Sequence, residues 1–148
     1  MSSSDTARAW IDGAARGNPG DAGFGVHLER DGVTEEIVGF LGRTTNNVAE
    51  YAALLAVLTY ARRAGIVDLH VHSDSQLLVR QLEGQYRVKA PHLVPMFLKV
   101  LELRRAIPRL KVSHVRREQN KDADRLANRA IDERAPVPDW LELEAHGD

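Results

Sequence analysis

Apolar and polar residues alternate along five short stretches of the chain, and elsewhere apolar residues recur at spacings of three and four. Alternation is typical of strands and the wider spacing of helices. The alternating stretches predict strands over residues 7–12, 23–30, 33–41, 69–74 and 110–117. Helices are predicted over residues 75–82, 92–106 and 122–134, and over a longer stretch that begins at a cap on Asn46 or Asn47 and ends near Arg63.

The order of these elements predicts an α/β fold in which helices flank a five-stranded mixed sheet, three strands antiparallel and two parallel. The first three strands form a meander, with a hairpin turn at Arg30–Gly32. The last two strands follow helical crossovers, which parallel pairing requires. We expect one domain over residues 1–135, because the chain has the length of a single core.

Residues 136–148 contain two prolines and several carboxylates, and we interpret them as an acidic tail or linker. Trp140 lies within this segment. It could pack back on the domain, or it could belong to a linker or docking peptide for a fused or docked second domain. The sequence leaves both alternatives open, and we expect the chain to be a monomer.

Composition narrows the class of protein. The absence of cysteine excludes a disulfide framework and a thiolate metal site. The longest stretch without charge, residues 51–61, is too short to span a bilayer, and the first residues lack the apolar segment of a signal peptide. These features predict a soluble, cytoplasmic protein. The net charge of −1 counts mildly against a nucleic-acid binder, which more often has a basic excess.

Four carboxylates stand at the ends of predicted elements. Asp12 and Asp74 close strands, whereas Glu50 and Asp124 lie in the first turns of helices. Each alone could be a cap or a partner of a helix dipole. Together they indicate a cation site, because converging carboxylates repel one another unless a cation lies between them. Oxygen ligands without histidine or cysteine suit Mg²⁺ or Mn²⁺, and several acids together suggest a two-metal site for chemistry on phosphate.

Glycines surround the first of these acids in "DGAARGNPGDAG", at positions 13, 17, 20 and 23. They could let backbone N–H groups approach a large anionic ligand, or they could simply form a tight hairpin turn. The sequence "TTNN", Thr44–Asn47, adds uncharged donors that could meet sugar hydroxyls or a phosphate, or could cap a helix.

Four motifs in order resemble those of the type 1 ribonuclease H family: "DGAARGNPG", "NNVAEYAAL", "HSDSQLLVRQL" and "NKDADRLANRA". The resemblance covers about residues 7–131. It implies a ribonuclease H-like fold and a catalytic site in which Asp12, Glu50, Asp74 and Asp124 bind two Mg²⁺ ions, with Mn²⁺ able to substitute. It also implies hydrolysis of the RNA strand of RNA/DNA hybrids by a two-metal-ion mechanism, leaving 5′-phosphate and 3′-hydroxyl ends.

The resemblance extends to substrate contacts. The positions that match contacts to RNA 2′-hydroxyl groups are the backbone of Gly13–Arg16 (Gly13, Ala14 and Arg16 among them), Asn46, Asn47, Ser75, Gln76 and the side chain of Glu50. Those that match a pocket for a DNA phosphate are Asn18, Thr44 and Thr45.

In two departures from the family pattern the chain resembles a prokaryotic branch of the family, to which we expect it to belong. Many members carry a histidine in the loop before the last helix, whereas this loop reads "RREQNK". Arg116, Arg117 and Glu118 are the candidates for its role in proton transfer or product release. The basic protrusion of some members is also missing, and the corresponding segment offers only Arg87 and Lys89.

Two alternatives stay open beside the hybrid-specific endonuclease. A metal-dependent nuclease of broader range would also cut double-stranded RNA. A non-catalytic module would bind hybrids without cutting them, although it would have no need to keep all four acids.

Overall fold

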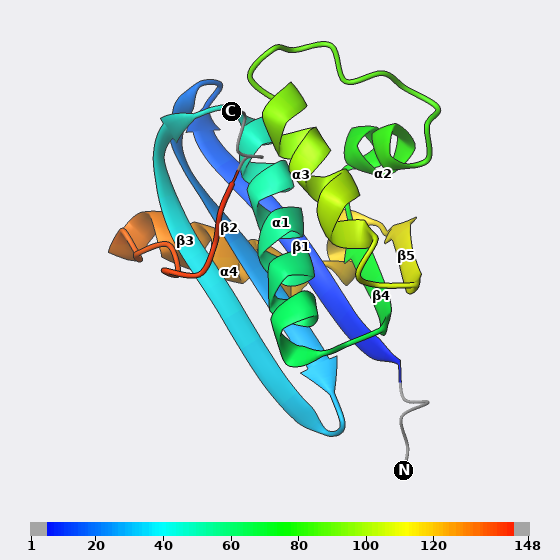
Figure 1. Cartoon of the computed structure of the whole chain (residues 1–148). Helices are drawn as coiled ribbons and strands as arrows, with labels where there is room; N and C mark the ends of the chain where they lie inside the picture. The colour runs from blue at the N-terminus through cyan, green and yellow to red at the C-terminus, as the bar shows by residue number, and fades with distance from the viewer. Residues whose placement is uncertain (1–5, 144–148) are drawn as a thin grey trace.

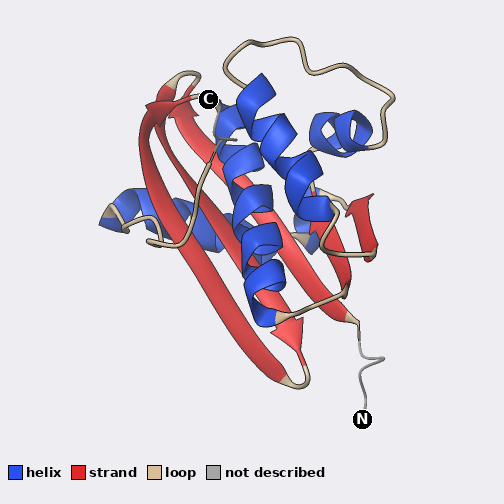
Figure 2. Cartoon of the chain, in the orientation of Figure 1, coloured by secondary structure: helices blue, strands red, loops and turns tan. Residues whose placement is uncertain are grey.

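A five-stranded sheet with the strand order β3-β2-β1-β4-β5 carries the fold of the computed structural model, which describes residues 6–143. Helices cover both faces of this sheet (Figures 1 and 2). The elements in chain order are β1 (Ala7–Gly17), β2 (Gly20–Arg30), β3 (Val33–Thr44), α1 (Asn46–Ala64), β4 (Asp68–Ser73), α2 (Gln76–Leu82), α3 (Val94–Arg104), β5 (Arg109–His114), the 3₁₀ turn η1 (Arg117–Gln119) and α4 (Lys121–Glu133).

The strand pairing confirms the predicted fold class. β1 pairs antiparallel with β2, and β2 pairs antiparallel with β3. β4 joins the other side of β1 in parallel, and β5 continues in parallel beside β4. In Figure 1, α1 and α3 lie in front of the sheet and α4 crosses behind it. The parallel pairing of β1 with β4 brings the ends of two acid-bearing segments to one place.

Helix α1 is the centre of the core, because the sheet covers one side and α3 the other (Figure 1). Its residues from Ala49 to Leu58 are all buried, as expected for a helix that is apolar nearly all round. Its N-cap is Thr45, whose hydroxyl accepts a hydrogen bond from the Val48 amide at 3.3 Å. The prediction of a cap at Asn46 or Asn47 was therefore wrong by a residue or two.

Strand β1 differs from its predicted extent. It continues through Asp12 to Gly17, where a two-residue turn with a cis Asn18–Pro19 peptide leads into β2. Only its pairing with β4 stops early, at Ile11 opposite Ser73. The apolar pattern fades after Asp12 because one neighbouring strand is lost there, while the antiparallel partner continues. Asp12 thus marks the point where β1 and β4 separate.

The glycines near Asp12 serve the fold. A Cβ atom on Gly13 would lie 2.2 Å from the Ala49 carbonyl carbon, so α1 can approach β1 only because residue 13 has no side chain. Gly17 has a φ of 108° and faces Gly20 across the hairpin turn. For Gly17 and Gly20 the structure supports the hairpin-turn alternative.

The fifth strand and the third helix are shorter than predicted. β5 ends at His114 instead of residue 117, because the chain then turns into η1. α3 starts at Val94, after a turn at residues 91–93, and has Pro95 in its first turn, where the missing N–H is tolerated.

The segment after α4 packs on the domain over residues 134–143. The Phe40 amide donates to the Ala135 carbonyl at 2.7 Å, and Leu141 is 9% exposed. The Trp140 ring centroid lies 6.4 Å from that of Tyr60. Packing therefore continues past the predicted boundary at residue 135, and residues 144–148 of the predicted tail lie outside the described part.

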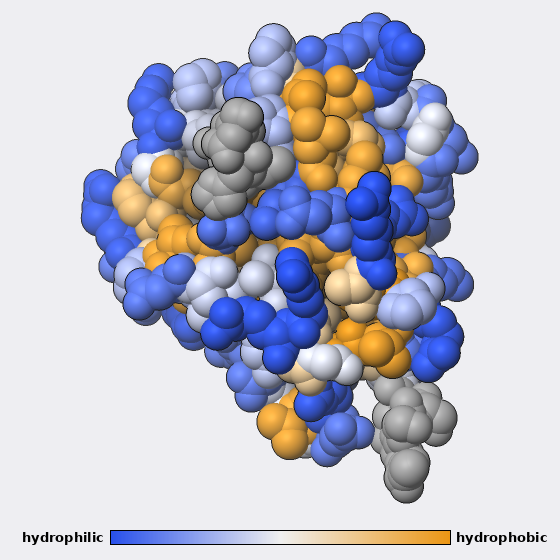
Figure 3. Space-filling view, in the orientation of Figure 1, coloured by the Kyte–Doolittle hydropathy of each residue, from blue (hydrophilic) through white to orange (hydrophobic). Residues whose placement is uncertain are grey.

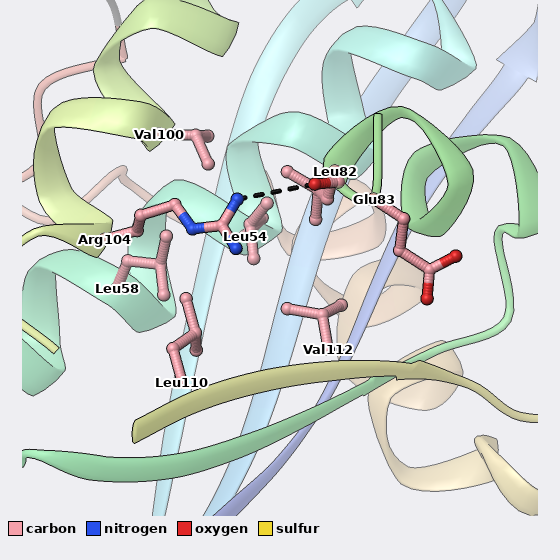
Figure 4. A pocket seen from close by; sticks show the side chains of 8 residues that line it. All are labelled: Leu54, Leu58, Leu82, Glu83, Val100, Arg104, Leu110 and Val112. Atoms are coloured by element: carbon pink, nitrogen blue, oxygen red, sulfur yellow. Dashed lines mark hydrogen bonds between the residues drawn. The ribbon is translucent and has the colours of Figure 1, made fainter. Parts of the chain in front are cut away.

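A small apolar cavity of about 90 Å³ lies between α1, α3 and β5 at the end of α2 (Figure 4). Leu54, Leu58 and Val112 are among the side chains that line it. Arg104 reaches across it, and its Nη1 donates to the Leu82 carbonyl at 3.4 Å. This contact ties the last turn of α2 to α3.

Within residues 6–143, no helix has the length and apolar content needed to cross a bilayer.

Helix α4 can lie directly on β2 because residue 25 is glycine. A Cβ atom there would lie 2.6 Å from the Ala127 amide nitrogen. We expect Gly25→Ala to lower the free energy of unfolding by about 3 kcal/mol, at the upper end of the range for overpacking. Urea unfolding measures the loss. Gly32→Ala is the comparison, because Gly32 has open space but a φ of 78°, and strain alone should cost about 1 kcal/mol. Equal losses would contradict the role of Gly25.

Candidate functional site

Three acidic side chains from three elements meet where β1 and β4 separate. Asp12 projects from β1, Glu50 from the second turn of α1 instead of the predicted first turn, because the helix already begins at Asn46, and Asp74 from the residue after β4. One carboxylate oxygen of each lies within 4.8 Å of the others. Asp12 and Glu50 are buried, at 6% and 9% exposure. The fold thus brings three carboxyl groups together at a site that is largely shielded from water.

Asp124 joins this group from the opposite face of the sheet. It lies in the first turn of α4, and both its charge and a hydrogen bond to Asp12 raise the pKa of Asp12. Its own Oδ1 accepts a hydrogen bond from Asn128 Nδ2 at 3.4 Å. The structure therefore brings all four predicted acids together, with Asp12 in the middle.

The electrostatics of the site favour a cation. Burial, followed by the charges of Asp74, Glu50 and Asp124, raises the pKa of Asp12 to about 9. Burial and the charge of Asp74 raise the pKa of Glu50 to about 8. The Oε2 atom of Glu50 is buried and has no hydrogen-bond partner among the described residues. An unpartnered oxygen beside three further carboxylates fits a hard divalent cation such as Mg²⁺ or Mn²⁺.

Two predicted substrate-contact residues orient Glu50. The Gly13 backbone N–H and the Ser75 side chain both form hydrogen bonds to its carboxylate and lower its pKa. The Ser75 hydroxyl also caps α2, accepting from the Leu78 amide at 3.2 Å. Gln76, the first residue of α2, is exposed beside it.

The other predicted contacts gather at the turn between β1 and β2 and at the start of α1. Asn18 Oδ1 accepts a hydrogen bond from the Asn46 amide at 3.1 Å, and Thr44 pairs with Gly20. Asn47 is exposed, whereas Thr45 is occupied as the helix cap. These donors therefore lie side by side on one surface.

Arg16 and Ala14 extend from the same hairpin. The Arg16 side chain is engaged with α4, where its Nη1 lies 2.7 Å from Asp132 Oδ1 and its Nη2 lies 3.2 Å from Asn128 Oδ1. Ala14 is half-buried on β1. A contact between Arg16 and a ligand would use its backbone unless this ion pair opens.

The loop candidates Arg116, Arg117 and Glu118 lie at η1, between β5 and α4. Arg117 is close enough to Glu50 for its charge to lower the pKa of that carboxyl. Arg116, Arg117 and Glu118 are all exposed. The effect of its charge on Glu50 is therefore what distinguishes Arg117 from its two neighbours.

Asn120 is a site residue that the sequence analysis missed. Its buried Nδ2 donates to the carbonyl of Ile11 at 2.8 Å, and Ile11 directly precedes Asp12. The hydrogen bond ties the start of α4, which carries Asp124, to the strand that carries Asp12. An asparagine before a helix reads locally as an N-cap, but this side chain forms no cap hydrogen bond.

Comparisons with known proteins agree with this geometry. Residues 11–130 match the family described as reverse transcriptase-like. The ribonuclease HI of Halobacterium salinarum is 41% identical over 127 residues, covering 84% of this chain and 64% of that protein. The crystal structure of LC11-RNase H1 in complex with an RNA/DNA hybrid superposes with a TM-score of 0.81 at 42% identity, covering 86% of this chain and 98% of that one. The chain belongs to the type 1 ribonuclease H family.

Membership confirms the predicted family, whereas the predicted branch of the family stays a prediction. The chain spans only part of some relatives. The bifunctional protein Rv2228c of Mycobacterium tuberculosis is 40% identical over 124 residues, which cover 82% of this chain but 34% of that protein. At least one ribonuclease H relative is therefore much longer than this domain.

The raised pKa of Asp12 predicts how the stability of this ribonuclease H domain depends on pH without metal. The folded state keeps a proton on Asp12 up to about pH 9, whereas an unfolded chain releases it near pH 4. Because the folded state binds more protons between these values, stability falls as pH rises through this window. We expect Asp12→Asn to stabilise the metal-free protein at pH 8 by at least about 1.4 kcal/mol, the equivalent of one pKa unit.

The measurement is urea unfolding of both proteins in chelator, at pH 8 and again near pH 3.5. Near pH 3.5 the wild-type aspartic acid is largely protonated and as neutral as the asparagine, so the gain in the free energy of unfolding should vanish. Asp122→Asn is the matched control, because Asp122 is exposed in the first turn of α4. A gain of equal size at both pH values would contradict the assignment to Asp12 ionisation.

Proposed function

We propose that this chain is a metal-dependent endoribonuclease that hydrolyses the RNA strand of RNA/DNA hybrids, leaving 5′-phosphate and 3′-hydroxyl ends. The observation that carries the proposal is the convergence of Asp12, Glu50 and Asp74 within 4.8 Å, with Asp12 and Glu50 buried. A fold gains no stability from such repulsion, so the arrangement points to a bound cation and to chemistry. The family relationship points to the same activity.

The carboxylates of Asp12, Glu50, Asp74 and Asp124 would hold two Mg²⁺ ions, for which Mn²⁺ could be exchanged. Two such ions, when bound, supply an activated water and stabilise the charge on the leaving oxygen of a phosphodiester. The chain's own groups hold the ligands in place. Gly13 and Ser75 fix Glu50, and Asn120 fixes the strand before Asp12.

Specificity for RNA would come from donors that meet 2′-hydroxyl groups near the cut, since only RNA offers them. The backbone from Gly13 to Arg16, together with Asn46, Asn47, Ser75 and Gln76, would serve this purpose. Asn18, Thr44 and Thr45 would hold a phosphate of the DNA strand. The hydrogen bond from the Asn46 amide to Asn18 supports one continuous surface for both strands. LC11-RNase H1, solved with an RNA/DNA hybrid, supports this class of substrate.

Cleavage of end-labelled RNA in a hybrid, as a single strand and in an RNA duplex tests the function. With Mg²⁺ or Mn²⁺ we expect cutting of the hybrid alone, and none with chelator. Asp124→Asn should lower turnover by more than about 100-fold. Loss of a residue that only bonds to a metal ligand costs at most about that much, so a larger loss indicates that Asp124 is itself a ligand.

The matched control for Asp124→Asn is Asp122→Asn, which removes the same charge from the same helical turn and should leave turnover unchanged. Cutting of the RNA duplex as well would favour the nuclease of broader range. Binding of the hybrid without cutting would leave a binding module.

Arg117 is the best-placed group for the role of the missing loop histidine, because its charge acts on Glu50. We expect Arg117→Ala to lower kcat by about tenfold, the equivalent of 1.4 kcal/mol of transition-state stabilisation. Arg117→Lys should recover part of this loss, since it restores the charge. Arg116→Ala, measured beside it in the same assay, should change kcat far less. Equal losses for Arg116 and Arg117 would show that only the net charge of the loop matters.

A further inference from the structure

The loop between α2 and α3 (residues 83–93, the α2–α3 loop) carries two cations that the metal site does not use. Arg87 and Lys89 are both part of it, and Tyr86 is 47% exposed. In Figure 1 the loop arches over the upper end of α3. Figure 3 shows a hydrophilic upper edge there, beside an apolar surface over the upper part of α3.

A depression of about 550 Å³ lies under this loop. Arg87 and Lys89 line it together with the apolar side chains of Val88, Val94 and Phe97. None of its lining residues is acidic. A lining that combines cations with apolar side chains suits a sugar–phosphate strand, whose phosphates are charged and whose sugars are not.

The loop has little regular structure of its own, so its place depends on contacts with α2. The Gln85 amide donates to the Arg80 carbonyl at 2.9 Å. On the exposed side, Arg80 Nη1 donates to the Tyr86 hydroxyl at 2.7 Å. On the buried side, Gln81 Nε2 donates to the carbonyl of Arg87 at 3.3 Å. The backbone of a loop cation is therefore bonded to a buried side chain.

Tyr51 holds that buried amide in place. Its hydroxyl donates to Gln81 Oε1 at 2.6 Å, and Gln81 is 7% exposed. The Arg87 carbonyl can only accept, so it fixes the orientation of the amide in which Gln81 Nε2 faces it. The Tyr51 hydroxyl then supplies the donor for the Gln81 oxygen. Without this hydroxyl the oxygen would be buried and unpaired, and the amide would lose one of its two partners.

Tyr51 also follows Glu50 directly on α1, so one helical turn reaches both the acids and the loop. We propose that Tyr51 and Gln81 are positioning residues for the nucleic-acid substrate: through the Arg87 carbonyl they hold the α2–α3 loop at a fixed place relative to the four acids. This inference rests on the proposed function and deepens it. α2 is seven residues long, or about 10 Å at 1.5 Å per residue, and it separates the start of the loop from Asp74 along the chain. Displacing the loop should therefore weaken substrate binding and leave the chemical step intact.

The test uses Tyr51→Phe and Gln81→Leu in steady-state cleavage of the hybrid with Mg²⁺. We expect KM to rise about three- to tenfold, as for the loss of one buried hydrogen bond, with kcat within about twofold. Val57→Ala, a buried truncation in the same helix, is the control for general destabilisation. A KM rise equal to that of the control, or a kcat loss as large as the KM rise, would overturn the proposal.

A double-mutant cycle isolates the coupling. Arg87→Ala should weaken hybrid binding in the wild-type background and reduce the slope of log K against log salt by about 0.9, the equivalent of one phosphate contact. In the Tyr51→Phe background the same substitution should cost clearly less, because the loop is already displaced. Strict additivity of the two substitutions would overturn the proposal while leaving the nuclease function intact.

A readout that needs no substrate separates the two levels of inference. Amide hydrogen exchange at Gln85 and Tyr86, both bonded to the Arg80 carbonyl, should accelerate in Tyr51→Phe and Gln81→Leu but not in Val57→Ala. Unchanged exchange would overturn the anchoring. A wild-type protein that binds no hybrid would instead overturn the proposed function, and the role in substrate positioning with it.

Discussion

The repulsion among the buried carboxylates is the constraint on which the rest of the structure depends. Two unit charges about 4 Å apart near a protein surface repel by about 4 kcal/mol, and Asp12 faces three such partners. Protonation or a cation must relieve this energy. Neutral donors carry out much of the positioning, since Gly13 and Ser75 hold Glu50 and Asn120 holds the Ile11 carbonyl. A site held mainly by dipoles stays negative and keeps its affinity for cations.

The core supplies the rigidity that this repulsion requires. α1 is buried between the sheet and α3, so Glu50 cannot move away without disturbing a helix that is apolar on nearly all sides. Gly13 and Gly25 have no side chain at the points where α1 and α4 rest on the sheet. Close approach of two helices from opposite faces is therefore what brings Glu50 and Asp124 to the same strand residue. The acids meet because α1 and α4 both lie unusually close to the sheet at Gly13 and Gly25.

Local patterns predicted much of this arrangement and missed its long-range parts. Alternation and helical spacing predicted all five strands and four helices, because those patterns reflect burial on one side of each element. They placed the end of β1 at Asp12, because the apolar pattern stops where β1 loses its pairing with β4, although its pairing with β2 continues to Gly17. They also missed Asn120, whose hydrogen bond to Ile11 joins positions 109 residues apart. The ion pair of Arg16 with Asp132 and the packing of Trp140 on Tyr60 have the same character. No local spacing encodes such contacts.

Helix α2 shows how closely the parts of the site depend on one another. A helix of seven residues is too short to be stable alone, so tertiary contacts must fix both of its ends. At its start, Ser75 caps it and bonds to Glu50, and at its end Arg104 bonds to the Leu82 carbonyl. Between them, Gln81 bonds to Tyr51, the residue after Glu50. Both anchors on α1 are adjacent residues, so any shift of α1 that moves the acids also moves α2 and the loop beyond it. One turn of α1 therefore contacts both the acid site, through Glu50, and the end of α2, through Tyr51. For this reason neither the acids nor the cationic loop can move far without the other.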